Sequence, residues 1–355
     1  MTRQQLRISI VCVLAVACSV SAAALLAQTA APPVFPNAPA GFDVRGPGVA
    51  TGRVERIEYT STVTGTKRPA MVYTPPGYSS ARKYPVLYLL HGIGGNETHW
   101  TQFGAADAIL DNLIASKRAL PMIVVMPNGR ASNEPSTMFG GRGGGRGAAA
   151  APGGAAAAPG GAPAGGGPPA PGGPPAAGGP PAQGAQPGRA GQPGGGGRPG
   201  GPGGGGAGMG VEFQAYAAFE RELIADLVPH IQANYSVEAN REQRALAGLS
   251  MGGGQSLNFG LANIDTFAWV GGFSSAPNTS QPAQLLKDPA AARQKLKLLW
   301  VSCGDQDSLF NISTGVHDYL VAQNVPHTWH IDLGGAHTFP VWKNDLYHLS
   351  TLLFR

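Results

Sequence analysis

Short apolar runs recur along this chain at intervals that leave room for a helix between them, and this pattern limits the fold more than any other feature. Continuous apolar runs of about four to eight residues are typical of strands buried on both faces, as in a parallel sheet covered by helices. The last run alternates more between polar and apolar residues. The pattern predicts a mostly parallel sheet, with strands near residues 85–90, 122–126, 245–249, 267–270, 298–303 and 327–333.

Segments with helical periodicity lie between the apolar runs. From Tyr216 to Ile231, apolar side chains follow the three-and-four spacing of one helix face. Strand and helix therefore alternate, which predicts an α/β fold of three layers, a sheet with helices on both faces. Further helices are predicted at 105–116, 252–261, 313–323 and 341–353, and a hairpin at 53–60 and 67–74.

A tract rich in Gly, Pro and Ala, residues 140–210, interrupts this order. It holds 32 of the 54 Gly and 14 of the 32 Pro, with no Asp or Glu. It has no strict three-residue period, which excludes a collagen helix, and it lacks the apolar groups that offset ordering entropy. We therefore expect a disordered, low-complexity insertion within one domain, 51–355, which follows a flexible lead-in at 28–50.

Residues 1–27 have the pattern of a secretory signal peptide. Arg3 and Arg7 form a basic start, an apolar run follows, and small residues near its end offer cleavage points. We expect a secreted or periplasmic protein with no membrane span in the mature chain. The alternatives are a retained membrane anchor and a lipoprotein acylated at Cys18.

The cysteine count excludes an internal disulfide in the mature chain, and the charge does not indicate a nucleic-acid-binding protein. Loss of the leader would leave Cys303 as the only cysteine, so an internal disulfide is excluded and a buried packing role is expected. The net charge is +5, but arginines of the leader and the tract account for it. The rest of the chain is near neutral, so its charge does not indicate a nucleic-acid partner.

The segment Gly248-Leu249-Ser250-Met251-Gly252 matches the G-x-S-x-G pattern of a nucleophile elbow. An apolar strand ends before the serine, and a glycine-rich stretch opens the next helix. A sharp strand-to-helix turn leaves no room for side chains beside the serine, so glycines are needed there. The pattern predicts Ser250 as a nucleophile at a helix N-terminus, whose dipole favours developing negative charge.

A nucleophilic serine needs a base and an acid that orients the base, and after such an elbow the acid precedes the histidine along the chain. The loop after the strand at 298–303 contains Asp305 and Asp307, and the loop after the next strand contains His337. Both loops follow C-terminal strand ends, on the same side of the sheet as Ser250. His337 is the predicted base, and spacing alone leaves both aspartates open as the acid.

A glycine-rich loop, His91-Gly92-Ile93-Gly94-Gly95, follows the predicted strand at 85–90. Glycines let backbone N–H groups point at a substrate oxygen. The N–H of Ile93 and that of Met251 would then form an oxyanion hole. The alternative is a plain turn that joins the strand to a helix.

The other histidines do not indicate a metal site. His327 and His330 are three apart on a strand and face opposite sides. No metalloprotease motif or cysteine cluster occurs, so we expect no metal and no cofactor. Loop or helix-surface positions are assigned to His99, His230, His317 and His348.

Five segments resemble the putative-esterase family of α/β-hydrolases. That family includes feruloyl and acetyl-xylan esterases, S-formylglutathione hydrolases, enterochelin esterases and mycolyltransferases. The likeness is greatest to the feruloyl-esterase domains of xylan-degrading systems, and it covers about 53–139 and 211–355 but not the tract. The segments are YTPPGY (73–78), YLLHGIGGNETHW (88–100), GLSMGG (248–253), GDQDSL (304–309) and GGAHTFPVW (334–342).

The resemblance implies an α/β-hydrolase fold with Ser250 as nucleophile, His337 as base and Asp307, rather than Asp305, as acid. It also implies that the N–H of Ile93 contributes to the oxyanion hole. Two aromatic residues, Trp100 and Trp342, match positions where the family often carries aromatics and are candidate substrate contacts, with core packing as the alternative for Trp342.

These features together predict a secreted serine esterase that forms an acyl-enzyme and needs no cofactor. The expected substrates are small or polysaccharide-linked esters, with feruloyl or acetyl groups of plant polysaccharide favoured. The sequence indicates no oligomeric state. The alternatives are an acyltransferase similar to mycolyltransferases, a siderophore esterase, and a non-catalytic surface-binding protein.

Overall fold

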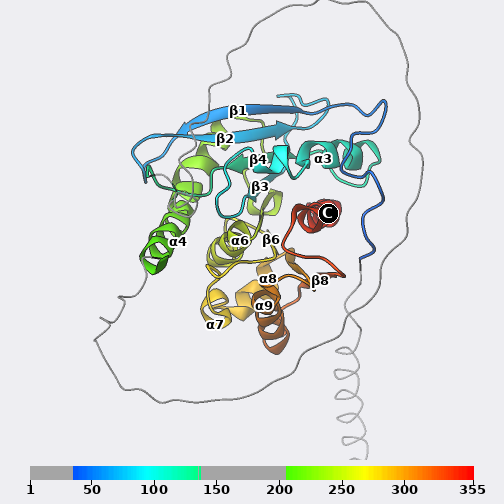
Figure 1. The fold of residues 1–355 in the computed structure, drawn as a ribbon. Coiled ribbons are helices and arrows are strands. Elements are labelled where there is room, and N and C mark those ends of the chain that lie inside the picture. The colour runs from blue at the N-terminus through cyan, green and yellow to red at the C-terminus, as the bar shows by residue number, and fades with distance from the viewer. Residues whose placement is uncertain (1–34, 135, 137–204) are drawn as a thin grey trace, which may run out of the picture. The chain divides into compact units, whose positions relative to one another are not determined.

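A single eight-stranded sheet in the order β1-β2-β4-β3-β5-β6-β7-β8 organises the described part of the chain (Figure 1). The computed structural model describes residues 35–134, 136 and 205–355, with only the backbone at 205–208. The strands are β1 (Arg53–Thr60), β2 (Lys67–Thr74), β3 (Val86–Leu90), β4 (Ile123–Pro127), β5 (Arg244–Leu249), β6 (Trp269–Phe273), β7 (Leu298–Gly304) and β8 (Thr328–Asp332).

The sheet is mostly parallel, as predicted. All pairs from β4 through β3 to β8 are parallel, and only the hairpin β1–β2 and its junction with β4 are antiparallel. Strands β3 to β6 are buried along their whole length. Their continuous apolar sequences follow from this burial, because both faces of a central parallel strand contact helices.

Helices cover both faces of the sheet, which confirms the three layers. Successive residues of β3 point to opposite faces, so Val86 and Tyr88 belong to one apolar core and Leu87 and Leu89 to the other. One core contains α3 (Ala106–Ala115), α10 (Phe339–Leu352) and the short α2 (His99–Gln102). The other contains α4 (Gly205–Glu222), η1 (Leu223–Leu227), α5 (Val228–Asn234), α6 (Met251–Ala262), α7 (Pro282–Leu285), α8 (Pro289–Lys295) and α9 (Phe310–Ala322).

The helix predicted from Tyr216 differs from expectation at both ends. It begins at Gly205, so the last six residues of the predicted tract, 205–210, are helical. Glycine is about 1 kcal/mol less favourable than alanine in a helix, so the glycine-rich composition of 205–210 did not predict helical turns there. Near its end the helix widens into the π-helical η1, just before Pro229. The rest of the predicted tract lies outside the described residues.

Residues 35–50, predicted as part of a flexible lead-in, pack against the domain. The Phe35 ring lies 5.2 Å from that of Trp300, and the Ala38 N–H donates to Asn344 Oδ1 at 2.8 Å. Arg45 pairs with the buried Asp111 at 2.8 Å. These contacts connect distant positions and carry no local sequence signal, which explains the difference. The predicted signal peptide at 1–27 lies outside the described residues, and none of the described helices is long and apolar enough to cross a membrane.

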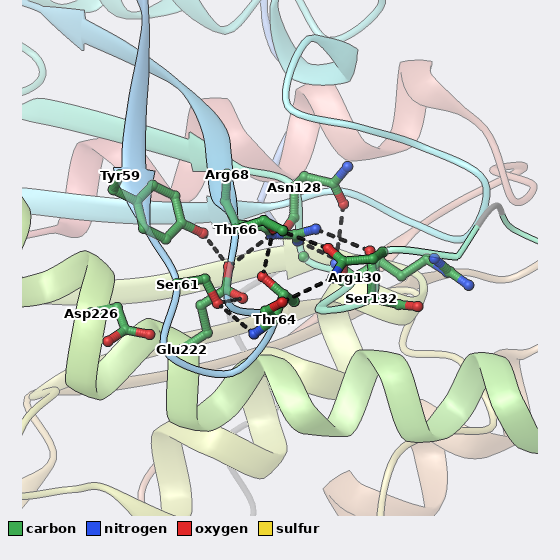
Figure 2. A network of polar contacts seen from close by, with 12 residues as sticks. Tyr59, Ser61, Thr64, Thr66, Arg68, Asn128, Arg130, Ser132, Glu222 and Asp226 are labelled. Atoms are coloured by element: carbon green, nitrogen blue, oxygen red, sulfur yellow. Dashed lines mark hydrogen bonds and ion pairs between the residues drawn. The ribbon is translucent and has the colours of Figure 1, made fainter.

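A buried polar cluster joins the β1–β2 hairpin to the end of α4 (Figure 2). Glu222 accepts hydrogen bonds from the Ser61 hydroxyl at 2.7 Å, from Arg68 Nε at 3.1 Å and from the Tyr59 hydroxyl. Arg68 also donates to the carbonyl oxygen of Arg130 at 2.6 Å, in the loop after β4. We call Tyr59, Ser61, Arg68 and Glu222 the hairpin network; it fixes the antiparallel edge of the sheet to its helical layer.

Candidate active site

Ser250 occupies the turn between β5 and α6 with φ 54° and ψ −118°. Positive φ is strained for a residue with a side chain, and such strain persists only where the surroundings enforce it. Here the Ser250 N–H donates to the carbonyl of Phe273 at 2.9 Å, and its own carbonyl accepts from the N–H groups of Gly254 and Ala276 at 3.0 and 3.1 Å. These bonds hold the serine at the C-terminal edge of the sheet.

The glycines of the elbow are required by close backbone contacts. A Cβ at Gly248 would lie 2.6 Å from the backbone of Gly252, and a Cβ at Gly252 would lie 2.5 Å from the carbonyl oxygen of His91. Real Cβ atoms do not approach backbone atoms so closely. The steric reason given for the G-x-S-x-G spacing is therefore visible in the structure.

His337 lies in the loop between β8 and α10 and joins Ser250 to Asp307. Its Nε2 is 2.9 Å from Ser250 Oγ, and its Nδ1 is 2.7 Å from Asp307 Oδ2. The Asp307 side chain is fully buried, and its second oxygen accepts the N–H of Leu309 at 2.8 Å. A carboxylate at Nδ1 fixes the proton on that nitrogen, so Nε2 is free to accept the proton of the serine hydroxyl.

Asp305, the alternative acid, has a different contact. Its Oδ1 accepts the N–H of Gly334 at 2.7 Å, and the neighbouring Gln306 N–H donates to the carbonyl of Gly335 at 2.8 Å. Both bonds connect the acid loop to the loop that carries His337. Asp305 therefore holds the position of the His337 loop, while Asp307 contacts the His337 ring itself.

The two predicted oxyanion donors border the nucleophile. Met251 is the first residue of α6, where N–H groups have no partner within the helix. A Cβ at Gly92 would lie 3.1 Å from Ser250 Cβ, so the loop that carries Ile93 passes beside the serine. Among the described residues, neither the N–H of Ile93 nor that of Met251 makes a backbone hydrogen bond. Both remain available to a substrate oxygen.

His91 fixes the glycine-rich loop and was not singled out from the sequence. Its Nε2 accepts the N–H of Gly129 at 2.9 Å, so its Nδ1 carries the proton and donates to the carbonyl of Gly92 at 2.7 Å. Burial lowers the pKa of His91 to about 4, which keeps the ring neutral. The Tyr216 hydroxyl donates to the same Gly92 carbonyl at 3.2 Å. The only available signal was the position of His91 directly before the glycines.

The two tryptophans proposed as substrate contacts are both buried. Trp100 is 1% exposed and its indole N–H donates to the carbonyl of Leu90 at 2.9 Å, so it belongs to the core beneath the site. The Trp100 side chain therefore turns toward β3. Trp342 packs edge-on against His337, with ring centroids 4.9 Å apart. The Trp342 ring therefore supports the position of the His337 ring.

Buried polar side chains also gather on the elements that flank the His337 loop. Side-chain atoms of His330 and Asp332 from β8 and Asp345 from α10 lie within 4.8 Å of one another. Burial and the neighbouring Asp332 raise the pKa of Asp345 well above its usual range, which favours its protonated form. The sequence did not predict this group, because Asp345 lies in the predicted helix 341–353 and its burial leaves no mark in the helical spacing.

Two further side chains can be compared with their predicted positions. His348, assigned to a helix surface, is buried because α10 turns this residue toward the sheet, and burial lowers its pKa to about 4. Cys303 is buried, as predicted, and burial raises the pKa of its thiol to about 12. Its thiol is therefore a packing group at neutral pH.

Comparison with known proteins gives one family and a consistent set of relatives. The chain matches the family described as Putative esterase over residues 61–156 and 207–348. An endo-1,4-beta-xylanase/feruloyl esterase of Xylanibacter ruminicola is 28% identical over 309 residues, which are 86% of this chain and 32% of that protein. The chain thus spans about a third of the length of this relative.

Solved structures show the same fold at low sequence identity. A CE1 ferulic acid esterase from the anaerobic fungus Anaeromyces mucronatus aligns with a TM-score of 0.65 and 22% identity, over 91% of this chain and 98% of that one. An S-formylglutathione hydrolase from Staphylococcus aureus aligns with a TM-score of 0.52 and 17% identity, over 86% and 100%. With an α/β-hydrolase fold and the family match over two long segments, the chain belongs to the Putative esterase family.

Proposed function

We propose that this protein is a serine esterase in which Ser250, His337 and Asp307 form the catalytic triad. The observation that carries the proposal is the position of the His337 ring, 2.9 Å from the serine hydroxyl and 2.7 Å from a buried carboxylate. The strained backbone of Ser250 and the available N–H groups beside it support the same assignment.

The reaction follows from this geometry. His337 Nε2 takes the proton of Ser250 as its oxygen attacks the ester carbonyl, and the N–H groups of Ile93 and Met251 stabilise the negative charge on the carbonyl oxygen. The imidazolium then gives its proton to the leaving alcohol, and Asp307 stabilises that imidazolium. Water, deprotonated by His337, attacks the acyl-enzyme, releases the acid and restores the serine.

An apolar cluster next to the oxyanion donors provides a surface for the acyl group. Tyr216, Met251 and Ala276 form its buried part, and Ile93 and Phe213 pack against it. An apolar wall suits an acyl chain or an aromatic acid better than a charged one. Together with the xylanase and feruloyl-esterase names of the relatives, it favours feruloyl or acetyl esters of plant polysaccharide as substrates.

A fluorophosphonate probe and a hydrolysis panel test this function. We expect the probe to label the wild-type protein and not Ser250→Ala, while Ser308→Ala, an exposed serine in the acid loop, serves as the control. The panel compares acetyl, feruloyl and longer acyl esters. Failure to label Ser250 would favour a non-catalytic binding protein, and transfer to an added alcohol at low concentration would identify an acyltransferase.

Export of the protein is a separate proposal that rests on residues 1–27. Expression in a secreting host, followed by N-terminal sequencing of the protein found outside the cytoplasm, tests it. A chain that starts near residue 28 supports cleavage, and a lipid-modified Cys18 would favour the lipoprotein alternative.

A further inference from the structure

Phe103 is unusual among the large apolar side chains of the described residues, because it is an aromatic ring and is 52% exposed. It follows the short helix α2 and contacts two other rings. Its centroid lies 5.3 Å from that of His99 and 5.6 Å from that of Phe339, to which it is inclined by 35°. His99 and Phe339 are both partly exposed. We call these three residues the aromatic patch.

The aromatic patch is connected to the proposed catalytic base through Trp342. The Phe339 ring lies 5.1 Å from that of Trp342, which in turn packs edge-on against His337 at 4.9 Å. Phe339 is also two residues after His337 in the chain. On its other side the patch borders the oxyanion loop, because a Cβ at Gly95 would lie 2.6 Å from His99 Nδ1.

The side of the site on which the patch lies indicates what it contacts. The apolar cluster of Tyr216, Met251 and Ala276 includes the side chain of one proposed oxyanion donor, and the side chain of the other, Ile93, packs against it, which places the cluster on the acyl side. The leaving alcohol must instead lie next to His337, because Nε2 gives it a proton. The patch packs against His337 through Trp342, so it extends from the alcohol side.

We propose that the aromatic patch binds a sugar ring of the alcohol part of the substrate, an inference that rests on the proposed esterase function. A sugar presents a face of C–H groups that packs on an exposed aromatic ring, and Phe103 offers such a ring at no cost in desolvated polar groups. Burial lowers the pKa of His99, so that the patch is uncharged at neutral pH and suits a neutral carbohydrate.

The experiment compares two feruloyl esters that differ only in the alcohol. Methyl ferulate and a feruloylated arabinoxylo-oligosaccharide are assayed with wild type, Phe103→Ala, Phe103→Tyr and Val321→Ala, the last being an exposed apolar residue on α9. For Phe103→Ala we expect the ratio of KM for the oligosaccharide to KM for the methyl ester to rise about five- to tenfold. Phe103→Tyr, which keeps the ring, and Val321→Ala should keep the wild-type ratio.

The outcomes separate this inference from the esterase function. If the wild type hydrolyses neither ester, the proposed substrate class is wrong whatever the patch does. If it hydrolyses both and Phe103→Ala keeps the wild-type ratio, the sugar-binding role is overturned and the esterase function stands. An equal rise in KM for both esters would also overturn it, because the patch would then contact the acyl group. Loss of binding of unesterified oligosaccharide in Ser250→Ala/Phe103→Ala, relative to Ser250→Ala, would support the role without any turnover.

Discussion

Glu222 and Asp345 are both fully buried carboxyl groups, but their surroundings differ completely. Glu222 accepts hydrogen bonds from Tyr59, Ser61 and Arg68 in the hairpin network (Figure 2). Within the described part of the chain, neither oxygen of Asp345 accepts a hydrogen bond. A buried carboxyl group needs donors or a bound proton, so Glu222 is stabilised by its donors, whereas burial without donors favours a proton on Asp345.

The two carboxyl groups, Glu222 and Asp345, also lie in different parts of the fold. The hairpin network holds the antiparallel edge of the sheet against α4, far along the sheet order from the loops that carry Asp307 and His337. Asp345 lies on α10, the helix that directly follows the His337 loop. Asp307 is a third buried carboxyl group, and its Oδ2 lies 2.7 Å from Nδ1 of His337, the proposed base.

The largest effect should come from Asp307→Asn. An amide in place of the carboxylate presents an N–H to His337 Nδ1 and favours the wrong tautomer, so kcat should fall about 10⁴-fold. The fold should be retained, because Asn has the same shape. Steady-state kinetics on the best ester of the panel, together with a urea melt, measure both quantities.

Asp305→Asn is the matched control for this change. Its Oδ1 only accepts the N–H of Gly334, and the amide oxygen of Asn can accept the same bond. We expect kcat to stay within a few-fold of wild type. An equal loss of kcat in both variants would mean that the two aspartates act together and that Asp307 alone is not the acid that orients His337.

The next largest effect should be the loss of stability in Arg68→Met. This change removes the guanidinium and leaves Glu222 buried without its counter-charge, which costs about 3–5 kcal/mol of the free energy of unfolding. Urea denaturation at pH 7 measures the loss. Lys295→Met removes an exposed pair with Asp265 and should change the free energy by less than about 1 kcal/mol.

A double variant sharpens this result. Arg68→Met/Glu222→Leu removes both charges, so it should be more stable than the sum of the single losses predicts. Strict additivity would show that the hairpin network acts through the carbonyl contact of Arg68 with Arg130 rather than through the ion pair.

The strands were predictable because each is a short apolar run with its own local signal. The predicted hairpin 53–60 and 67–74 coincides with β1 and β2, and β7 extends the predicted run 298–303 by one residue. The strand predicted at 267–270 lies at 269–273 instead. Phe267 and Ala268 are buried before the strand begins, and burial alone does not distinguish a strand from the chain that enters it.

The site was predictable where chemistry imposes a motif. Ser250 needs glycines around it, and His337 and Asp307 must follow C-terminal strand ends, so their positions follow from spacing and resemblance. Asp345 and Phe103 could not be found in this way. Their environment depends on contacts between elements distant in the chain, and a helix that carries an aspartate or a loop that carries a phenylalanine gives no local signal of burial or exposure.

The last change in this series, Asp345→Asn, alters how stability depends on pH. Burial and the nearby Asp332 raise the pKa of Asp345, so the native state keeps a proton that the unfolded chain loses near pH 4. Above that pH the wild type loses stability by at most about 1.4 kcal/mol per pH unit until the native group also ionises, and the amide of the variant, which does not titrate, has no such loss. The variant should therefore gain stability relative to wild type as pH rises, measured by urea melts from pH 4 to 8.

Asp318→Asn, an exposed change on α9, should give no such rise. Parallel curves for wild type and Asp345→Asn would show that the native state does not keep the extra proton on Asp345, and the contrast with Glu222 would then disappear.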